Sequence, residues 1–527
     1  MKIVFFLVLA LPIFSQAEFT NICERSEPVK INLENQTRKK CDLITQKDLD
    51  TVWEINLRSK NISNLKSGDF SGLNKLEQLY LSYNQLTELP EEIFNGLTEL
   101  KGLFLEKNNL NHLPAKLFQD LKSLKFLILH DNKIDKLNAS QFSDLISLLN
   151  LDLAGNALEE LDPGIFSRLE NLEEMNLSSN KIKTLPANIF KDLKKLKWSI
   201  SLAKNQIADI QPNTFENQKI LERLMLDNNQ LSAIDPLAFK GLEKMTWLHI
   251  KNNKIQSVDG LFSSIPQLEY LDISGNNISR ITTETFSRMN LLKWLNISNN
   301  RIETISAENL RALKALNNLN LSSNFITHMP SLELNSLSEI NMSNNKLTNL
   351  PIDAFKKIRS VKRIDFRKNQ LTSLSENVLK SIAGPELTIN LSDNNISKIS
   401  ENVFSPSNRP KRTKLKIANN PLSEQTKSLL SKQLTYNVNF NKAISKNGWF
   451  CSQSYKENIH LSFSENGRTA GIRSNTTSDV LLFDFMKTDS KSDTFVDKEQ
   501  NLLTVPSITD DLYVFSIELK GKLYTCN

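Results

Sequence analysis

Side chains that could do catalytic chemistry are thinly spread along this chain of 527 residues. The five histidines stand singly, at His112, His130, His249, His328 and His460. No H-E-x-x-H, G-x-S-x-G or cysteine–histidine pairing accompanies them. Acidic pairs such as Glu159–Glu160 and Asp510–Asp511 are more typical of solvated turns than of an acid–base pair. We therefore expect no enzyme activity, and an unfamiliar tail after residue 444 is the only place left for an active site.

Phosphate and nucleic-acid chemistry are also disfavoured. The chain has only 14 glycines and no G-x-x-x-x-G-K or G-x-G-x-x-G run that could hold a nucleotide phosphate. Its 65 basic residues are nearly balanced by 59 acidic residues, for a formal net charge of +6. This balance lacks the strong basic excess of nucleic-acid-binding domains. We expect no cofactor and no nucleic-acid partner.

The N-terminus has the features of a secretory signal peptide. Lys2 precedes an apolar run over 3–14 and the small-residue site Ser15-Gln16-Ala17, which predicts cleavage after Ala17. A membrane anchor is the alternative, but the run is shorter than the roughly 20 apolar residues that a span needs. No later segment is long and apolar enough to cross a bilayer. The sequence predicts a secreted, extracellular protein without a membrane span.

Most of the chain repeats one pattern, L-x-x-L-x-L-x-x-N-x-L, as in 76–86, 100–110 and 124–134. Each copy predicts a short strand with inward leucines, followed by a turn where the asparagine amide satisfies buried backbone groups. This asparagine recurs, mostly every 24 residues, at Asn84, Asn108, Asn132, Asn156, Asn180, Asn205, Asn229, Asn253, Asn276, Asn300, Asn324, Asn345, Asn369, Asn394 and Asn420.

A phenylalanine lies behind the predicted strand in most copies, and these rings should stack as a second spine. They are Phe70, Phe94, Phe118, Phe142, Phe166, Phe190, Phe215, Phe239, Phe286, Phe355 and Phe404. One repeat buries too little apolar surface to offset the entropy of ordering about 24 residues, so stacking between repeats must stabilise the array.

On these motifs the chain resembles the extracellular leucine-rich-repeat family, which includes Toll-receptor ectodomains, chaoptin-like adhesion proteins and insect leucine-rich immune proteins. The resemblance covers roughly residues 50 to 422. It implies an α/β leucine-rich-repeat solenoid, a horseshoe with a parallel β-sheet on its concave face. Three departures predict local irregularities: Lys60 replaces the first ladder asparagine, the step from Asn324 to Asn345 is short, and one residue is inserted beside Trp198.

Four cysteines flank the array and allow three disulfide connectivities. Their positions favour Cys23 with Cys41 and Cys451 with Cys526, because a long solenoid holds its two ends apart. A metal site is the weaker alternative, since no C-x-x-C pair or neighbouring histidine is present. The Cys23–Cys41 segment also looks like a reduced form of the family's N-terminal cap.

The sequence after the array predicts a short helix over 423–434 and then a different domain. Alternating apolar runs at 459–463, 480–485 and 512–519 indicate antiparallel strands. The expected organisation is a signal peptide at 1–17, an N-terminal disulfide cap at 18–52, leucine-rich repeats at 53–422, a C-terminal cap helix and linker at 423–443, and a small disulfide-bonded antiparallel β domain at 444–527.

Two aromatic stripes are predicted on the concave face, where the residues between and beside the strand leucines point. The first contains Tyr80, Phe104, Phe126, Ile128 and His130. The second contains Arg223, Met225, Trp247, His249, Lys251, Tyr270, Asp272 and Trp294. These side chains could merely cover the sheet by packing across strands. Exposed aromatics beside charges more often mark a contact surface, so we interpret them as candidate ligand-binding residues.

Glycosylation sequons bear on which part of the face is open. They occur at Asn35, Asn61, Asn138, Asn176, Asn277, Asn296, Asn320, Asn341, Asn390, Asn395 and Asn475. Five of them fall on the predicted concave face: Asn176, Asn296, Asn320, Asn341 and Asn390. Unless they are skipped during folding, glycans there would cover the later repeats and leave the two stripes open.

The run Arg409-Pro-Lys-Arg412 fits the R-x-K-R pattern of furin-like processing in a predicted loop. An exposed basic loop without a special role and a heparin-binding patch are the alternatives.

Together these features predict a secreted recognition protein that binds an extracellular protein ligand or receptor through the concave face. The resemblance adds an expected role in innate immunity or receptor regulation. An extracellular matrix or adhesion protein is the alternative, and recovery in an insoluble extracellular fraction would favour it.

Overall fold

The computed structural model describes residues 21–433 with gaps at 356–357, 359–360, 377, 381, 383–385 and 405–411. Of residue 412, residues 431–433 and the strands after 433 it describes only the backbone. The expected signal peptide therefore lies outside the described residues. The chain divides into two compact units, Met1–Asn277 and Ile278–Asn527, which are taken in turn.

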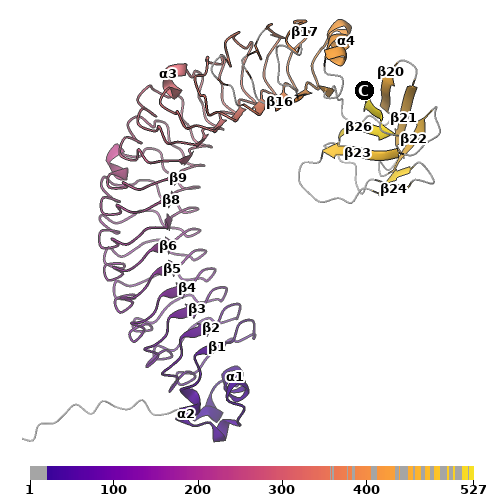
Figure 1. The fold of residues 1–527 in the computed structure, drawn as a ribbon. Helices are drawn as coiled ribbons and strands as arrows, with labels where there is room; N and C mark the ends of the chain where they lie inside the picture. The colour runs from indigo at the N-terminus through magenta and orange to yellow at the C-terminus, as the bar shows by residue number, and fades with distance from the viewer. Residues whose placement is uncertain are drawn as a thin grey trace, which may run out of the picture. The chain divides into compact units, whose positions relative to one another are not determined.

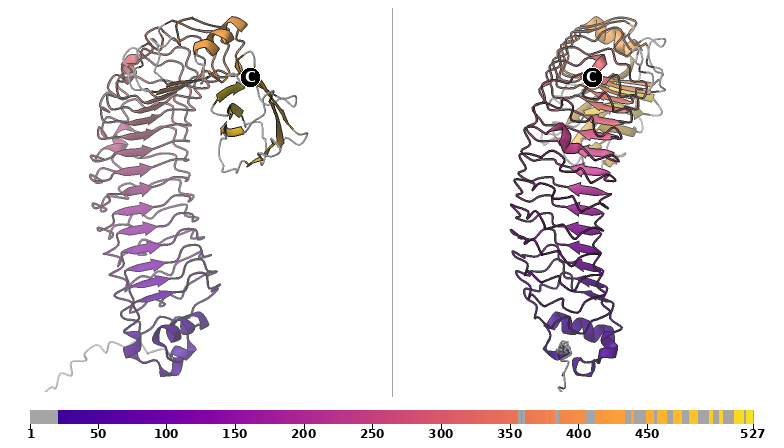
Figure 2. Two further views of the ribbon diagram at one scale, coloured as in Figure 1. Left: turned by 45° about the vertical axis from the view of Figure 1, so that its right-hand side comes forward. Right: turned by 90° about the vertical axis from the view of Figure 1, so that its left-hand side faces the viewer.

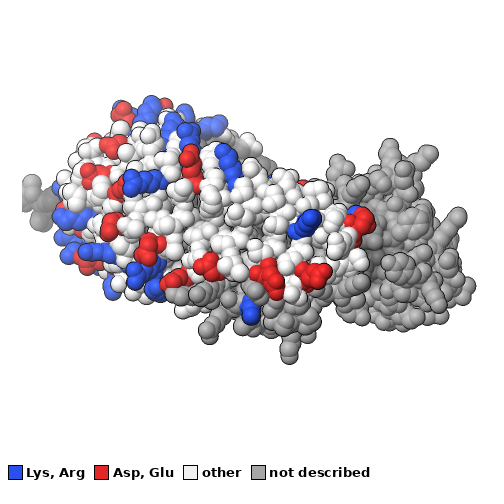
Figure 3. All heavy atoms as spheres, turned by 90° about the horizontal axis from the view of Figure 1, so that it is seen from above, with Lys and Arg blue, Asp and Glu red and all other residues white. Residues whose placement is uncertain are grey.

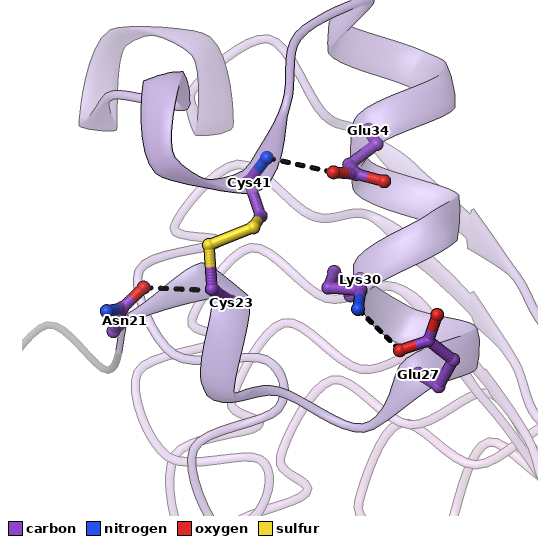
Figure 4. The surroundings of a disulfide bond; sticks show 6 residues. All are labelled: Asn21, Cys23, Glu27, Lys30, Glu34 and Cys41. Atoms are coloured by element: carbon purple, nitrogen blue, oxygen red, sulfur yellow. Dashed lines mark hydrogen bonds and ion pairs between the residues drawn. A yellow bond between two sulfur atoms is a disulfide. The ribbon is translucent and has the colours of Figure 1, made fainter.

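The first unit begins with a helical cap made of η1 (Ile22–Glu24), α1 (Glu27–Thr37), η2 (Cys41–Leu43) and α2 (Gln46–Leu49). Helix α1 ends where Arg38 adopts a left-handed backbone, and α2 begins with a capping box between Thr45 and Asp48. A disulfide joins Cys23 to Cys41 across 18 residues of sequence, with the Cα atoms 5.0 Å apart. Figure 4 shows this bond beside α1, whose Glu34 accepts a hydrogen bond from the Cys41 amide at 2.9 Å.

Buried charges attach the cap to the first repeat. Arg25 is 3% exposed, and its Nη1 donates to the carbonyl oxygen of Asp69 at 2.9 Å. The fully buried Asp69 carboxylate accepts from Ser26 N at 2.7 Å, from Ser26 Oγ at 2.6 Å and from Lys66 N at 2.8 Å. Burial lowers the pKa of Arg25 to about 10, and the nearby Asp69 charge acts in the opposite direction. Buried polar contacts thus attach the cap to the first repeat.

The rest of the first unit is a stack of short parallel strands (Figures 1 and 2). They are β1 (Glu54–Asn56), β2 (Gln78–Tyr80), β3 (Gly102–Phe104), β4 (Phe126–Ile128), β5 (Asn150–Asp152), β6 (Glu174–Asn176), β7 (Ser199–Ser201), β8 (Arg223–Met225), β9 (Trp247–His249) and β10 (Tyr270–Asp272). Each strand pairs in parallel with the next, and the middle residue of every strand is buried.

The expected asparagine ladder is present. In Asn229, Nδ2 donates to the carbonyl oxygens of Leu202 and Leu226 at 3.0 Å, and Oδ1 accepts from Ile207 N at 3.0 Å. One side chain thus satisfies backbone groups of its own repeat and of the preceding one. The same pattern holds from Asn84 to Asn420, and Lys60 at the start of the series donates its backbone N–H to Asn84.

A spine of buried phenylalanines runs behind the strands. In the first unit its rings include Phe190 and Phe215, which stack with centroids 5.5 Å apart. Phe262 also belongs to it and is 1% exposed. The repeat pattern did not predict Phe262, because it follows Ile255 by seven residues where the other copies have eight.

The second unit continues the same design. Its parallel strands are β11 (Trp294–Asn296), β12 (Asn318–Asn320), β13 (Glu339–Asn341), β14 (Arg363–Asp365), β16 (Glu386–Asn390), β18 (Arg412–Lys416) and β19 (Val438–Asn439). A second ladder pairs β15 (Ser373–Leu374) with β17 (Lys398–Ile399). The spine position in the repeat after β11 is taken by Leu310 of α3 (Ala307–Leu310), which is 1% exposed.

Arg412, the last residue of the candidate processing motif, lies in a strand, although a loop was expected there. Residues 409–411 lie outside the described residues, but β18 begins at Arg412, which pairs with Glu386 of β16. The next residue, Thr413, is fully buried and pairs with Leu387. The backbone from Arg412 onward is thus paired in the sheet, and cleavage after Arg412 stays a prediction, because the rest of the motif lies outside the described residues.

Helix α4 (Glu424–Gln433) follows the array where a helix was expected. Beyond it the backbone forms antiparallel strands: β20 (Trp449–Ser454), β21 (Glu457–Phe463), β22 (Thr469–Ser474), β23 (Val480–Met486), β24 (Phe495–Asp497), β25 (Leu502–Thr504), β26 (Tyr513–Leu519) and β27 (Lys522–Cys526). The register of β20 and β27 sets Cys451 opposite Cys526. Their side chains lie outside the described residues, so the disulfide between them stays a prediction.

Candidate functional site

The parallel register places the exposed side chains of the sheet in rows. We call the side of the sheet that faces away from the core the sheet face. Row one holds the first residue of each three-residue strand and row two the third. In the first unit, row one runs through Arg223, Trp247 and Tyr270, and row two through Met225, His249 and Asp272. Neighbours in a row are one strand spacing apart, about 4.8 Å.

Trp247 is the centre of a cluster in row one. Its ring stacks on Tyr270 with centroids 4.4 Å apart and planes inclined by 17°. On the other side the Arg223 guanidinium carbon lies 5.6 Å from the Trp247 ring centroid, within cation–π range. Trp247 and Tyr270 are half-buried and Arg223 is exposed. The three side chains form a continuous aromatic and cationic surface on rigid strands.

Polar contacts fix the orientation of Trp247 from row two. Its Nε1–H donates to Nε2 of His249, and Nδ1 of His249 lies 3.5 Å from the Asp227 carboxylate. Asp227 is 7% exposed and also accepts from Lys251 N at 3.0 Å. The two ring nitrogens of His249 thus face different partners, Nε2 the Trp247 indole and Nδ1 the Asp227 carboxylate. This chain of contacts links the Trp247 ring through His249 to Asp227.

The earlier stripe is organised differently. Tyr80 and Phe104 are neighbours in row two and stack with centroids 4.6 Å apart. The Phe104 ring lies against Gly102. A Cβ atom added at Gly102 would come within 2.8 Å of this ring. Phe126 in row one is 42% exposed, and Ile128 lies beside Phe104 in row two. This stripe presents apolar side chains, in contrast to the mixed aromatic and cationic cluster at Trp247.

His130 ends the earlier stripe, two positions after the β4 strand. Its Nδ1 lies 3.0 Å from a carboxylate oxygen of Asp131. Between the two stripes the face carries the small side chains of β7, Ser199 and Ser201, which are buried, and the sequon residue Asn176 at the end of β6. Apart from Trp294, the two predicted stripes are thus separate surfaces of the first unit.

Trp294 lies on β11 in the second unit and contributes to a different feature. Together with polar residues of β12–β14, β16 and β18 it lines an open hollow of about 380 Å³ on the sheet face. Sequence reasoning placed Trp294 with the Trp247 stripe and did not single out its polar neighbours. Their short amide and carboxylate side chains, which leave the hollow open, gave no recognisable motif.

The five sequon asparagines expected on the face lie in row two, at the ends of their strands. Each closes the following turn: Asn320 Oδ1, for example, accepts from Ser322 N at 3.1 Å and from Ser322 Oγ at 2.8 Å. Of the other sequons, Asn35, Asn61, Asn138 and Asn395 are exposed, Asn277 is half-buried, and Asn475 lies outside the described residues.

Two half-buried carboxylates, Asp152 and Asp365, share row two with these asparagines. Burial raises the pKa of Asp152 and of Asp365, although each accepts a hydrogen bond from the backbone amide two residues later. Among the described residues, no group of three or more His, Cys, Asp and Glu side chains could hold a metal ion. None of the described helices is long and apolar enough to cross a membrane.

Charge is mixed on the face of the molecule that Figure 3 draws. In the view of Figure 3, Lys and Arg side chains alternate with Asp and Glu among uncharged residues. Such a surface offers no large field of one sign to attract a polyanion.

The fold of this chain is similar to the folds of several solved structures. Three similar solved structures are a leucine-rich-repeat protein of Leptospira interrogans, Toll in the Drosophila Toll–Spatzle complex, and the LRIM1/APL1C complex. The first is 26% identical with a TM-score of 0.56, covering 75% of this chain and 97% of its own. Toll is 20% identical with a TM-score of 0.59, covering 79% and 64%. The third is 21% identical with a TM-score of 0.54, covering 66% and 61%.

A search of curated proteins found no match. A family model described as leucine rich repeat matches nine overlapping segments: 50–110, 81–134, 98–158, 125–182, 146–198, 198–255, 220–278, 266–326 and 335–384. These segments span more than half of the chain, and their strands and ladder asparagines are those described above. The chain therefore belongs to the leucine-rich-repeat family, and its described repeats form a parallel-strand solenoid of that family.

Proposed function

We propose that this chain is a secreted recognition protein that binds an extracellular protein partner through the sheet face around Trp247. The observation that carries the proposal is the arrangement of Trp247 between Tyr270 and Arg223, with its indole N–H held by His249. Trp, Tyr and Arg are the side chains that most often dominate the binding energy of protein interfaces. A ring that is already fixed loses little conformational entropy on binding.

The second support is the openness of this part of the face. Among the strand residues of β1–β10 only Asn176 lies in a sequon, so glycans would leave the Trp247 cluster uncovered. The surface is built on strands rather than loops, which suits a rigid interface. Nothing in it resembles a catalytic constellation, so the proposed role is binding without catalysis.

The immune part of the proposal rests on the similar structures alone. The Drosophila structure is described as a complex of Toll with Spatzle in development and innate immunity, and another as a complex of LRIM1 with APL1C. These proteins share the solenoid and assemble with proteins. By analogy we propose that this chain serves innate immunity or regulates a receptor.

The test begins with capture of partners from native extracellular fluid on the purified full-length protein, identified by mass spectrometry. The Trp247→Ala/Tyr270→Ala variant should bind the captured partner about thirtyfold more weakly, since a pocket-filling Trp contributes roughly 2 kcal/mol or more. The matched control is Phe104→Ala/Phe126→Ala, which removes two aromatics of the same face. Circular dichroism must show unchanged folding in both variants.

Three outcomes would contradict the proposal. If neither variant weakens binding by even about threefold, the aromatics only cover the sheet, and the contact lies elsewhere. If only the control variant weakens binding, the apolar stripe at Phe104 is the interface and the Trp247 assignment is wrong. Recovery of the protein in an insoluble matrix fraction, rather than in fluid, would favour the adhesion alternative.

A further inference from the structure

The hollow on the sheet face of the second unit has a chemistry unlike that of the Trp247 cluster. Its volume of about 380 Å³ lies in the range of small-ligand sites. Row one contributes Trp294, Asn318 and Arg363, and row two contributes Asn320, Asn341 and Asp365. The buried floor consists of the strand-centre residues Leu319, Ile340 and Ile364. The walls of the hollow are therefore almost wholly polar. The one aromatic ring, that of Trp294, lies at the end formed by β11.

We propose that this hollow binds a neutral oligosaccharide. Asparagine amides present donors and acceptors side by side, which suits sugar hydroxyls that both donate and accept. Trp294 adds an apolar ring face, on which the C–H face of a sugar can lie while its hydroxyls reach the amides. The charges in the lining balance, since Glu339 and Asp365 are matched by Arg363 and Lys416. A neutral ligand is thus favoured over an anionic one.

The geometry is fixed before binding, as selective recognition of hydroxyl groups requires. The lining residues lie on β11–β14, β16 and β18, in parallel register. At about 4.8 Å per strand, these five steps extend roughly 24 Å, long enough for more than one sugar ring. The Asn320 and Asn341 carbonyls accept from the backbone amides of Ser322 and Ser343 at 3.1 and 2.9 Å, which orients both amide planes.

The oligosaccharide could come from two sources. Asn320, Asn341 and Asn390 line the hollow and are themselves sequon residues, so an N-glycan of this chain could fill it. Asn296, Asn320 and Asn341 lie on three successive strands, about 4.8 Å apart. Glycans on neighbouring asparagines would crowd one another at that spacing, so we expect only some of the three to be modified. A free oligosaccharide is the other source, and the chemistry of recognition is the same for both.

The experiment uses the full-length secreted protein and a released oligomannose N-glycan as the probe. A variant without sequons in and beside the hollow carries Ser298→Ala, Ser322→Ala, Ser343→Ala and Ser392→Ala; we call it the sequon-free variant, although the sequons elsewhere in the chain remain. These changes remove the glycosylation signals on β11, β12, β13 and β16 but keep every asparagine of the hollow. Binding is measured by calorimetry and by saturation-transfer NMR, at probe concentrations up to the millimolar range.

The sequon-free variant should bind the probe, and Trp294→Ala in that background should weaken binding about tenfold or more. Trp247→Ala is the matched control, because it removes a half-buried Trp from the sheet face of the first unit, and binding should stay within about threefold. Binding by the glycosylated protein as well would identify a free sugar as the ligand. Binding by the sequon-free variant alone would identify the chain's own glycan as the occupant.

Two results would overturn the proposal. One is the absence of probe binding by a sequon-free variant whose circular dichroism matches that of the glycosylated protein. The other is binding that Trp294→Ala leaves unchanged. Neither result affects the protein partner proposed for the Trp247 cluster, because that binding is measured with a different ligand and a different variant.

Discussion

The sheet faces of the two units differ although the scaffold beneath them is the same. In both units the strand-centre residues are buried, and the ladder asparagine bonds in the same way at Asn229 and Asn345. On the face, the first unit has stacked aromatics at Trp247 and Tyr270, whereas row two of the second unit is mainly asparagine. The difference shows that the scaffold and the composition of the sheet face depend on separate positions of the repeat, so one can vary without the other.

The largest expected effect tests whether the scaffold is common to both units. Phe215→Ala in the first unit and Phe355→Ala in the second each remove a fully buried ring. We expect each to lower the free energy of unfolding of its unit by about 3–5 kcal/mol. Hydrogen exchange read separately for each unit measures this without assuming two-state unfolding. A large loss in one unit and none in the other would show that the two cores differ.

The disulfides provide the next test, at the two ends of the chain. Peptide mapping without reduction should link Cys451 to Cys526 as well as Cys23 to Cys41, because β20 and β27 set the first two opposite each other. Closing the long loop between Cys451 and Cys526 should stabilise the C-terminal strands by roughly 4 kcal/mol in the chain-entropy model. A free thiol, or a link from Cys23 or Cys41 to the C-terminal pair, would contradict this.

The ladder gives a smaller effect that should be equal in both units. Asn229→Ala and Asn345→Ala each leave at least three backbone groups without their partner. We expect a loss of about 1–3 kcal/mol in each, with the affinity of the face for its ligand unchanged. Thermal unfolding followed by circular dichroism, together with a binding assay, checks both parts. Weaker binding at unchanged stability would give the ladder a functional role instead.

The smallest effect concerns two half-buried carboxylates, one on the sheet face of each unit. Burial raises the pKa of Asp152 and Asp365, so their ionised forms destabilise the folded chain at neutral pH. That destabilisation fades as pH falls through the raised pKa and is absent below the ordinary value of about 3.9, where both states are protonated. Asp152→Asn and Asp365→Asn should therefore raise the unfolding midpoint slightly at pH 7 and leave it unchanged near pH 3.

The sequence predicts the scaffold better than the face. Ladder and spine positions recur with a fixed period, so the bonds of Asn229 and the burial of Phe215 follow from the repeat alone. Phe262 was missed, because its repeat is one residue shorter at that point. The left-handed backbone at Tyr83 and Lys107 could not be predicted, since residues of these types rarely adopt it.

The contacts on the sheet face are less predictable, because the residues that become neighbours in a row are known only once the register of the strands is known. The pattern correctly placed Trp247 beside Tyr270, but not the hydrogen bond to His249 or the buried Asp227 behind it. The hollow was missed altogether, because no single strand shows it and its residues come from six strands. Its sequons were interpreted only as glycan sites, since a sequon says nothing about what surrounds it.

The uniformity of the ladder has a consequence for how this chain reaches its native alignment. If a repeat packed one position out of place in the array, it would contact the same kind of strand, the same asparagine acceptor and the same phenylalanine ring. Regular repeats therefore impose little energetic cost on such a misalignment. Repeats of unequal length make the aligned and misaligned arrays differ in energy. The hydrogen bond from Ile326 N to Asn345 spans 19 residues and the one from Ile182 N to Asn205 spans 23, whereas regular copies span 22. Repeats of these unusual lengths fit only one position in the array, so they fix its alignment. A chain in which every repeat were made equal should refold in lower yield, with misaligned arrays among its products.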